Sequence, residues 1–362
     1  MKINPLVKKL AVSLLSFGVI CFLTEKSFLA NENKFIFDTN VYVQQAKPAL
    51  HKISKIPGLS YELIPGANTE NGFFKINSHG IRDKEYNIPK PKDVFRIIIL
   101  GDSVTFGTEY PIEQTYAKLL EQKLNKDQTA NVKYEVLNAG VCAYNAVQKY
   151  ILLKNKLIDY QPDLVIFQFL NDDYYRNAVI VPDYDSPGNH MHIDMGEYFA
   201  INFPKIMPIN EKNDRFLMKH SAVYRLINKS IYDFMSFKNP DKYIPQAYRY
   251  AGFNNLSESM RANKKIFHDF KKLAVEHNFK FMLMLVPELK NSDDLDPWIK
   301  QLGAKELDFK TLDLFSRFKL GGIDLTELRI IPQGNCHFNL IGHQLTADIL
   351  YSWLKDNQGI IP

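Results

Sequence analysis

Short continuous apolar runs recur along this 362-residue chain, and segments with helical periodicity separate them. Such runs are typical of strands buried on both faces of a sheet. The predicted strands are residues 97–100, 134–138, 164–170 and 281–286, with a fifth strand or a short helix at 307–315. The predicted helices are residues 111–124, 145–158, 257–274 and 340–354. This alternation predicts an α/β fold with right-handed βαβ units and a parallel sheet.

The alternation stops at residues 174–255, which are rich in Tyr, Asn, Asp and Pro and contain one predicted helix at 216–234. We interpret this segment as a long insertion after the third strand. Two interpretations stay open: a lid or substrate wall over the carboxyl edge of the sheet, and a segment with a structural role only.

An N-terminal segment at 31–94, called the prelude below, precedes the main domain at 95–362. It contains two predicted short strands, at 60–64 and 72–76.

The first thirty residues form a separate region. Lys2, Lys8 and Lys9 precede an uncharged run at residues 10–23, which is the form of a secretory signal. Phe28 disfavours cleavage after Ala30, so a cleaved signal and an uncleaved N-terminal anchor both stay open. Either places the body of the protein outside the cytoplasm, in a periplasmic or extracellular location or attached to the membrane.

The charge balance excludes one class of partner. The net charge is +5, and the three lysines near the N-terminus supply part of it. The remainder of the chain is not a basic domain, so there is no electrostatic case for binding nucleic acid.

Candidate chemistry collects at the carboxyl ends of the predicted strands. Gly101-Asp102-Ser103 directly follows the first buried run, the place where open α/β sheets carry their functional groups. Acyl transfer needs a nucleophile, a base and hydrogen-bond donors for the oxyanion. Ser103 and His337 fit the first two roles. The backbone N–H groups of Ser103 and Gly140 and the side-chain amide of Asn171 fit the third.

Four blocks in the chain resemble those of the SGNH or GDSL-like hydrolases and occur in the same order. They are residues 101–107 with Ser103, 138–145 with Gly140 as the oxyanion glycine, 161–172 with Asn171, and 336–343 with His337 as the base. The resemblance implies a flavodoxin-like three-layer α/β/α fold and ester or acyl-transfer chemistry without a metal or cofactor. Residues 77–82 (Asn-Ser-His-Gly-Ile-Arg) also resemble a lead-in of membrane-attached, polysaccharide-modifying members.

The chain departs from this family in two places. Phe169 stands where the third block has glycine, and Gly334 stands where the last block has the aspartate that orients the histidine. Loss of that carboxylate costs roughly 10⁴-fold in turnover in serine proteases. Asn335 is a possible neutral orienter of His337. The sequence thus leaves two alternatives, a working Ser103–His337 dyad or a protein without activity.

Other polar residues near these loops are interpreted as structural. Asp102 is expected to brace its loop, Asp172 and Asp173 to close the loop after the third strand, and His343 to pack at the start of the last helix. Cys142 and Cys336 lie beside the expected catalytic residues and are candidates for a disulfide in an exported protein.

The sequence therefore predicts an extracytoplasmic serine esterase or acyltransferase. The expected substrate is an O-acyl group, O-acetyl in particular, on a polysaccharide or other glycoconjugate. One alternative is a lipolytic esterase or thioesterase with the same site. Another, favoured by Gly334, is a catalytically silent polysaccharide-binding or assembly protein. The expected partners are an acylated carbohydrate or lipid substrate, and a membrane if the N-terminal segment is uncleaved.

Overall fold

The computed structural model describes residues 22–27, 50–59, 61–69, 72–127, 131–170, 173, 208–238, 256–286, 309–328 and 337–362. The chain divides into two units, which are described separately. One comprises Met1–Val43 with His192–Gln246, and the other comprises Gln44–Met191 with Ala247–Pro362.

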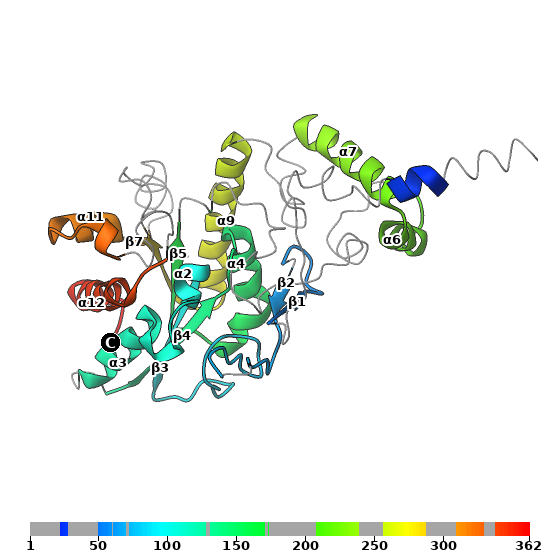
Figure 1. Ribbon diagram of the computed structural model, residues 1–362. Coiled ribbons are helices and arrows are strands. Elements are labelled where there is room, and N and C mark those ends of the chain that lie inside the picture. The colour runs from blue at the N-terminus through cyan, green and yellow to red at the C-terminus, as the bar shows by residue number, and fades with distance from the viewer. Residues whose placement is uncertain are drawn as a thin grey trace, which may run out of the picture. The chain divides into compact units, whose positions relative to one another are not determined.

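The second unit contains a five-stranded sheet in which every neighbouring pair is parallel (Figure 1). Its strands are β3 (Val94–Gly101), β4 (Lys133–Gly140), β5 (Leu164–Phe169), β6 (Lys280–Leu285) and β7 (Lys310–Asp313). Their spatial order is β4-β3-β5-β6-β7, which is the flavodoxin-like order 2-1-3-4-5. The predicted parallel α/β sheet is therefore confirmed.

Helices cover both faces of this sheet. The helices are α2 (Ser103–Phe106), α3 (Tyr116–Lys126), α4 (Ala146–Leu152), α9 (Leu256–Glu276), α11 (Leu314–Leu320) and α12 (Leu340–Asp356). Successive side chains of a strand point to opposite faces, and the two sets pack against different helices. On one face Phe167 of β5 packs edge-on against Phe270 of α9, which in turn contacts Tyr150 of α4.

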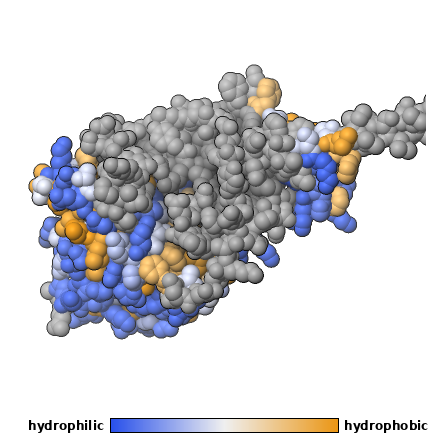
Figure 2. All heavy atoms as spheres, in the orientation of Figure 1, coloured by the Kyte–Doolittle hydropathy of each residue, from blue (hydrophilic) through white to orange (hydrophobic). Residues whose placement is uncertain are grey.

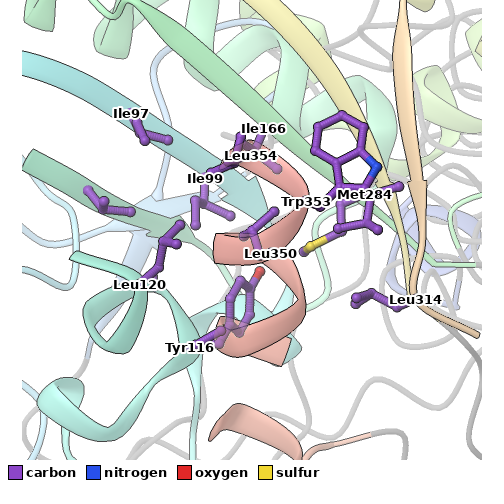
Figure 3. Packing of buried hydrophobic residues seen from close by; sticks show 14 of the residues in the cluster. Ile97, Ile99, Tyr116, Leu120, Ile166, Met284, Leu314, Leu350, Trp353 and Leu354 are labelled. Atoms are coloured by element: carbon purple, nitrogen blue, oxygen red, sulfur yellow. The ribbon is translucent and has the colours of Figure 1, made fainter. Parts of the chain in front are cut away.

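The other face carries a cluster of apolar side chains from the strands and from α3 and α12 (Figure 3). It includes Ile97, Ile99, Tyr116, Leu120, Ile166, Met284, Leu314, Leu350, Trp353 and Leu354. The three layers expected from the sequence are therefore present. Both faces of β3, which lies between β4 and β5, are buried, so its carboxyl end is held firmly in the sheet.

The structure corrects several predicted boundaries. The helix expected at 111–124 is a 3₁₀ turn, Ile112–Gln114, followed by α3, because Thr115 between them is extended. The helix expected at 145–158 changes after Leu152 into a π-helical turn, Leu153–Leu157, and then a 3₁₀ turn. The segment at 307–315, which fitted a strand or a short helix, contains the strand β7 and the first two residues of the helix α11, which follows β7 directly.

The prelude pairs differently from the prediction. The strand expected at 60–64 is β2 (Tyr61–Leu63), but its antiparallel partner is β1 (His51–Ile53), which the sequence did not indicate. The strand expected at 72–76 contributes only an isolated bridge between Asn68 and Lys75. Tyr61 Oη donates to the carbonyl of Cys142, so the prelude packs on the loop after β4.

In the other unit, the single helix expected at 216–234 is two helices, α6 (Glu211–His220) and α7 (Ala222–Lys238). The break falls at Ser221, which is extended and whose hydroxyl accepts from the N–H of Tyr224. Ser221 thus caps the second helix instead of continuing the first.

Within the described ranges, no helix is long and apolar enough to cross a membrane. The uncharged run at 10–23 lies almost wholly outside the described residues, so the signal or anchor stays a prediction. On the face seen in Figure 2, the described residues are mainly hydrophilic, with small hydrophobic patches between them.

Candidate active site

The predicted nucleophile lies where β3 ends and α2 begins. Ser103 is the first residue of α2, and the Asp102 side chain caps this helix by accepting the N–H of Val104 at 2.9 Å. Gly101 is required at the junction, because a Cβ there would lie 1.8 Å from the Thr105 hydroxyl. The tight turn fixes the backbone of Ser103 at the carboxyl edge of the sheet.

A short turn follows α2. Gly107 ends the helix in the left-handed region with φ 72°, and its N–H donates to the carbonyl of Ser103. This reversal brings the next residues, Thr108 and Glu109, back toward the nucleophile. The turn is favourable for glycine because other residues rarely adopt positive φ.

The predicted base is held just before α12. Phe338 next to it is buried in the core, and Asn339 caps the helix by accepting the N–H of Gly342 at 2.9 Å. The N–H of Asn339 also donates to the carbonyl of Leu328. His337 is therefore carried by two anchored neighbours, and its side chain is 13% exposed.

The structure brings Ser103 and His337 together and adds a carboxylate. Nε2 of His337 lies 2.8 Å from Oγ of Ser103, and Nδ1 lies 2.5 Å from Oε1 of Glu109. With Nδ1 protonated, the ring donates to Glu109 and accepts from the Ser103 hydroxyl. This is the geometry of a serine, histidine and carboxylate triad. Glu109 was not among the residues predicted from the sequence, which left open a Ser103–His337 dyad or a protein without activity.

The electrostatics of Glu109 agree with that role. Burial raises the pKa of its carboxyl, but hydrogen bonding and attraction to His337, with a hydrogen bond from Thr108, outweigh burial and hold the pKa below its ordinary value. Glu109 is therefore ionised at neutral pH, and a negative charge faces Nδ1 of His337. Such a charge stabilises the imidazolium that forms when the ring takes a proton.

Gly140 lies at the end of β4, beside α2. A Cβ there would fall 2.3 Å from the backbone nitrogen of Phe106, so this glycine allows the nucleophile helix to pack directly on the strand. Its N–H donates to the side chain of Asn138, whose amide in turn donates to the carbonyl of Thr105. The structure thus gives Gly140 a packing role, and its part in an oxyanion hole stays a prediction.

Several predicted residues lie outside the described residues. They are Asn171, Asp172, Gly334, Asn335 and Cys336. The oxyanion role of Asn171, the orienting role of Asn335 and a disulfide between Cys142 and Cys336 therefore remain predictions.

A cluster of buried charged side chains includes Asp102, the residue directly before the nucleophile. Lys149 Nζ lies 2.7 Å from Asp173 and 4.0 Å from Asp102. Burial raises the pKa of Asp173 to about 6, although Lys149 opposes that shift. Asp173 also accepts the N–H of Leu170. Asp102 and Asp173 brace their loops as predicted.

His343 also has the structural role that the sequence indicated. Its Nδ1 accepts the N–H of Tyr116, the first residue of α3, at 3.3 Å, and the two rings stack. Burial lowers the pKa of His343 to about 4. The ring is therefore neutral at physiological pH and is available as an acceptor.

Comparisons with protein-family models and with curated proteins find no match. Solved structures do show similarity. The acetyl xylan esterase AlAXEase is 14% identical with a TM-score of 0.40, over 72% of this chain and 100% of that one. A two-domain esterase active on acetylated mannans is 14% identical with a TM-score of 0.42, over 74% of this chain and 52% of that one. A putative lipolytic protein of the G-D-S-L family from Desulfitobacterium hafniense is 13% identical with a TM-score of 0.36, over 71% and 98%.

Similarity at this level says nothing about a substrate. The architecture is evident in the chain itself, from the order of its strands and from the Ser103–His337 pair at the carboxyl edge of the sheet. The chain has a flavodoxin-like three-layer α/β/α fold.

Proposed function

We propose that this protein is a serine esterase. The observation that carries the proposal is the continuous hydrogen-bonded chain from Ser103 through His337 to Glu109. A serine hydroxyl is a weak nucleophile on its own, and a base within hydrogen-bond reach activates it. A dyad without a carboxylate would be a poor catalyst, and Glu109 supplies that carboxylate.

The geometry supports two acyl-transfer steps. In the first, Oγ of Ser103 attacks the ester carbonyl carbon while Nε2 of His337 takes the hydroxyl proton. The tetrahedral oxyanion then collapses, the C–O bond to the alcohol breaks, and Nε2 returns the proton to the leaving alcohol. In the second, Nε2 takes a proton from water, whose oxygen attacks the acyl-enzyme. The carboxylic acid leaves and Oγ regains its proton.

The proposed substrate is an O-acyl group, O-acetyl in particular, on a polysaccharide or other glycoconjugate outside the cytoplasm. Support for this class comes from the signal-like N-terminus and from the lead-in at 77–82, which resembles that of polysaccharide-modifying proteins. An acyltransferase would use the same acyl-enzyme with a sugar hydroxyl in place of water. The feature that favoured a silent binding protein was the missing carboxylate at Gly334, and Glu109 offsets that loss.

The test is turnover of 4-nitrophenyl acetate by the full chain, beside Ser103→Ala and with labelling by a fluorophosphonate probe. We expect turnover and labelling in the wild type, and neither in Ser103→Ala. Equal turnover in the two proteins, or an unlabelled wild type, would contradict the proposal. Acetate release from acetylated xylan and mannan, compared with hydrolysis of a long-chain ester and of a thioester, then separates the substrate classes. Transfer to an added oligosaccharide separates acyltransferase from hydrolase.

A further inference from the structure

Arg82, the last residue of the 77–82 lead-in, is a buried cation with an unusual set of partners. The residue is 1% exposed. Nη1 donates to the carbonyls of Phe106 and Gly107, each at 2.6 Å, and Nη2 donates to the carbonyl of Tyr110 at 2.6 Å. A fourth and longer contact, at 3.5 Å, reaches the carbonyl of Phe73. The guanidinium is therefore bound mainly to one short stretch of main chain.

That stretch carries the carboxylate of the site. Phe106 and Gly107 precede Glu109, and Tyr110 follows it directly. Three hydrogen bonds from one planar group thus fix the backbone on both sides of Glu109. We propose that Arg82 is a positioning residue, which keeps the Glu109 carboxylate against Nδ1 of His337 by holding the turn between α2 and residue 111. This role rests on the proposed esterase function.

The surroundings of the guanidinium suit this role. The rings of Phe74 and Phe106 lie with their centroids 4.6 Å and 4.9 Å from its central carbon, within the range of cation–π attraction. Burial lowers the pKa of Arg82 to about 10, so the group stays charged in any assay near neutral pH. The buried positive charge also attracts the Glu109 carboxylate.

Lysine could not replace arginine here without loss. The guanidinium presents N–H groups in a rigid planar fork, whereas an ammonium is a compact point charge on a flexible stem. The fork spans the carbonyls of Phe106, Gly107 and Tyr110 at once. A lysine at 82 would keep the charge but lose most of these bonds.

The remaining residues of the lead-in explain how Arg82 is held. The side-chain oxygen of Asn77 accepts the N–H groups of His79 and Ile81 at 3.0 Å and 3.1 Å. Gly80 has φ 81°, and a Cβ there would lie 3.2 Å from the carbonyl of Leu63. Asparagine, glycine and arginine in this segment therefore build one turn, and that turn directs the guanidinium into the protein.

The test is a double-mutant cycle between Arg82→Lys and Glu109→Gln, measured as kcat and KM on 4-nitrophenyl acetate with active sites titrated by a fluorophosphonate. We expect Arg82→Lys to lower kcat by roughly 10- to 100-fold, the size associated with a misplacement of about 1 Å, with KM little changed. In the Glu109→Gln background we expect almost no further loss, because the carboxylate that Arg82 positions is already gone.

Arg96→Lys is the matched control. Arg96 is another fully buried arginine, near the amino end of β3, bound to Glu135 and to two main-chain carbonyls. We expect it to lower the melting temperature without changing kcat. If Arg82→Lys fails to fold, Asn77→Ala tests the same inference, since it keeps Arg82 and loosens only the turn that directs it.

Three results would overturn the inference while leaving the esterase intact. The first is a wild-type kcat in folded Arg82→Lys. The second is a double variant in which the losses in kcat from Arg82→Lys and Glu109→Gln multiply. The third is a loss of kcat in Arg96→Lys that equals the loss in Arg82→Lys and also disappears in the Glu109→Gln background. Absence of any Ser103-dependent turnover in the wild type would instead overturn the proposed function, and the inference with it.

Discussion

Oε1 of Glu109 lies 2.5 Å from Nδ1 of His337, although 228 positions separate the two residues in the chain. The other ring nitrogen of His337 contacts Ser103, from which Glu109 is separated only by the short helix α2 and its turn. The nucleophile and the carboxylate therefore come from one short segment of the chain, and the base comes from a segment near the C-terminus of the sequence. The imidazole is fixed between them.

Replacement of Glu109 by glutamine should lower kcat by roughly 10²- to 10⁴-fold with little change in KM. The upper bound is the loss seen when a triad aspartate becomes asparagine. Glutamine keeps the size of the side chain but removes the charge that stabilises the imidazolium. The measurement is steady-state hydrolysis of 4-nitrophenyl acetate. Glu113→Gln is the control, since Glu113 is exposed in the next turn; equal kcat values for the two variants would contradict the role of Glu109.

The stability of the Glu109 variant should depend on pH in a definite direction. The pKa of Glu109 is depressed in the folded protein, so its contribution is complete above the unfolded-state pKa of about 4.3. That contribution is lost as pH falls below this value through the folded-state pKa. Urea titrations of wild type and Glu109→Gln should therefore differ at pH 7 and converge in acid. A difference that grew in acid would contradict the depressed pKa.

The continuous apolar runs were sufficient to predict β3, β4, β5 and β6, because strands buried on both faces carry few polar side chains. Ser103 could be placed because it follows the buried strand β3, and His337 because it lies shortly before the last helix, α12, in a block that resembles the family pattern. β1 was not predicted, since its three residues, His51, Lys52 and Ile53, include a single apolar side chain and show no alternation. Its pairing depends on where the prelude packs.

Glu109 was missed for a physical reason. Its role depends on the positive φ of Gly107 and on the meeting of two segments distant in sequence, and neither leaves a periodic pattern. The signal that could have found it is a single acidic residue just beyond the glycine that ends the nucleophile segment. The pattern that the sequence resembles has this carboxylate just before the histidine, whereas Glu109 lies in the turn after α2.

Gly140→Ala should destabilise the protein by about 1–3 kcal/mol, in the range for overpacked sites. The added Cβ would meet the backbone of α2, and that backbone cannot move aside as a flexible side chain can. Because Ser103 begins this helix, kcat should fall together with stability, although alanine keeps the N–H at 140. Urea unfolding and turnover are measured on the same preparation.

Gly321→Ala is the control for that substitution. The Cβ of an alanine at 321 would meet no atom closer than 3.4 Å. We therefore expect the free energy of unfolding to change by no more than about 0.5 kcal/mol, and turnover to stay the same. Normal stability in Gly140→Ala with lost activity would show that the packing explanation is wrong.

His51→Phe should stabilise the protein, and more so in mild acid. Both ring nitrogens of His51 are buried without a hydrogen-bond partner among the described residues, and burial lowers its pKa to about 4. As pH falls from about 6.5 to about 4, the unfolded chain binds a proton that the folded chain does not. Wild-type stability then declines with a limiting slope of about 1.4 kcal/mol per pH unit from this group.

Phenylalanine does not bind a proton in either state, and its ring can keep the edge-on contact with Tyr61. The difference in free energy of unfolding between His51→Phe and wild type, measured with urea, should increase as pH falls from 7 to 4 and stay constant below pH 4. A constant gap over this range would mean that His51 takes up its proton while folded.

Introducing the absent family aspartate, Gly334→Asp, should leave the turnover of the wild type almost unchanged. Nδ1 of His337 already donates to Glu109, and one N–H cannot form a second strong bond of the same kind. In the Glu109→Gln variant, the imidazole of His337 has lost its carboxylate partner. There we expect Gly334→Asp to restore part of the lost kcat, because the family places its orienting aspartate three residues before the histidine. Increased turnover in the wild-type background would show that Glu109 is not an effective partner of the ring.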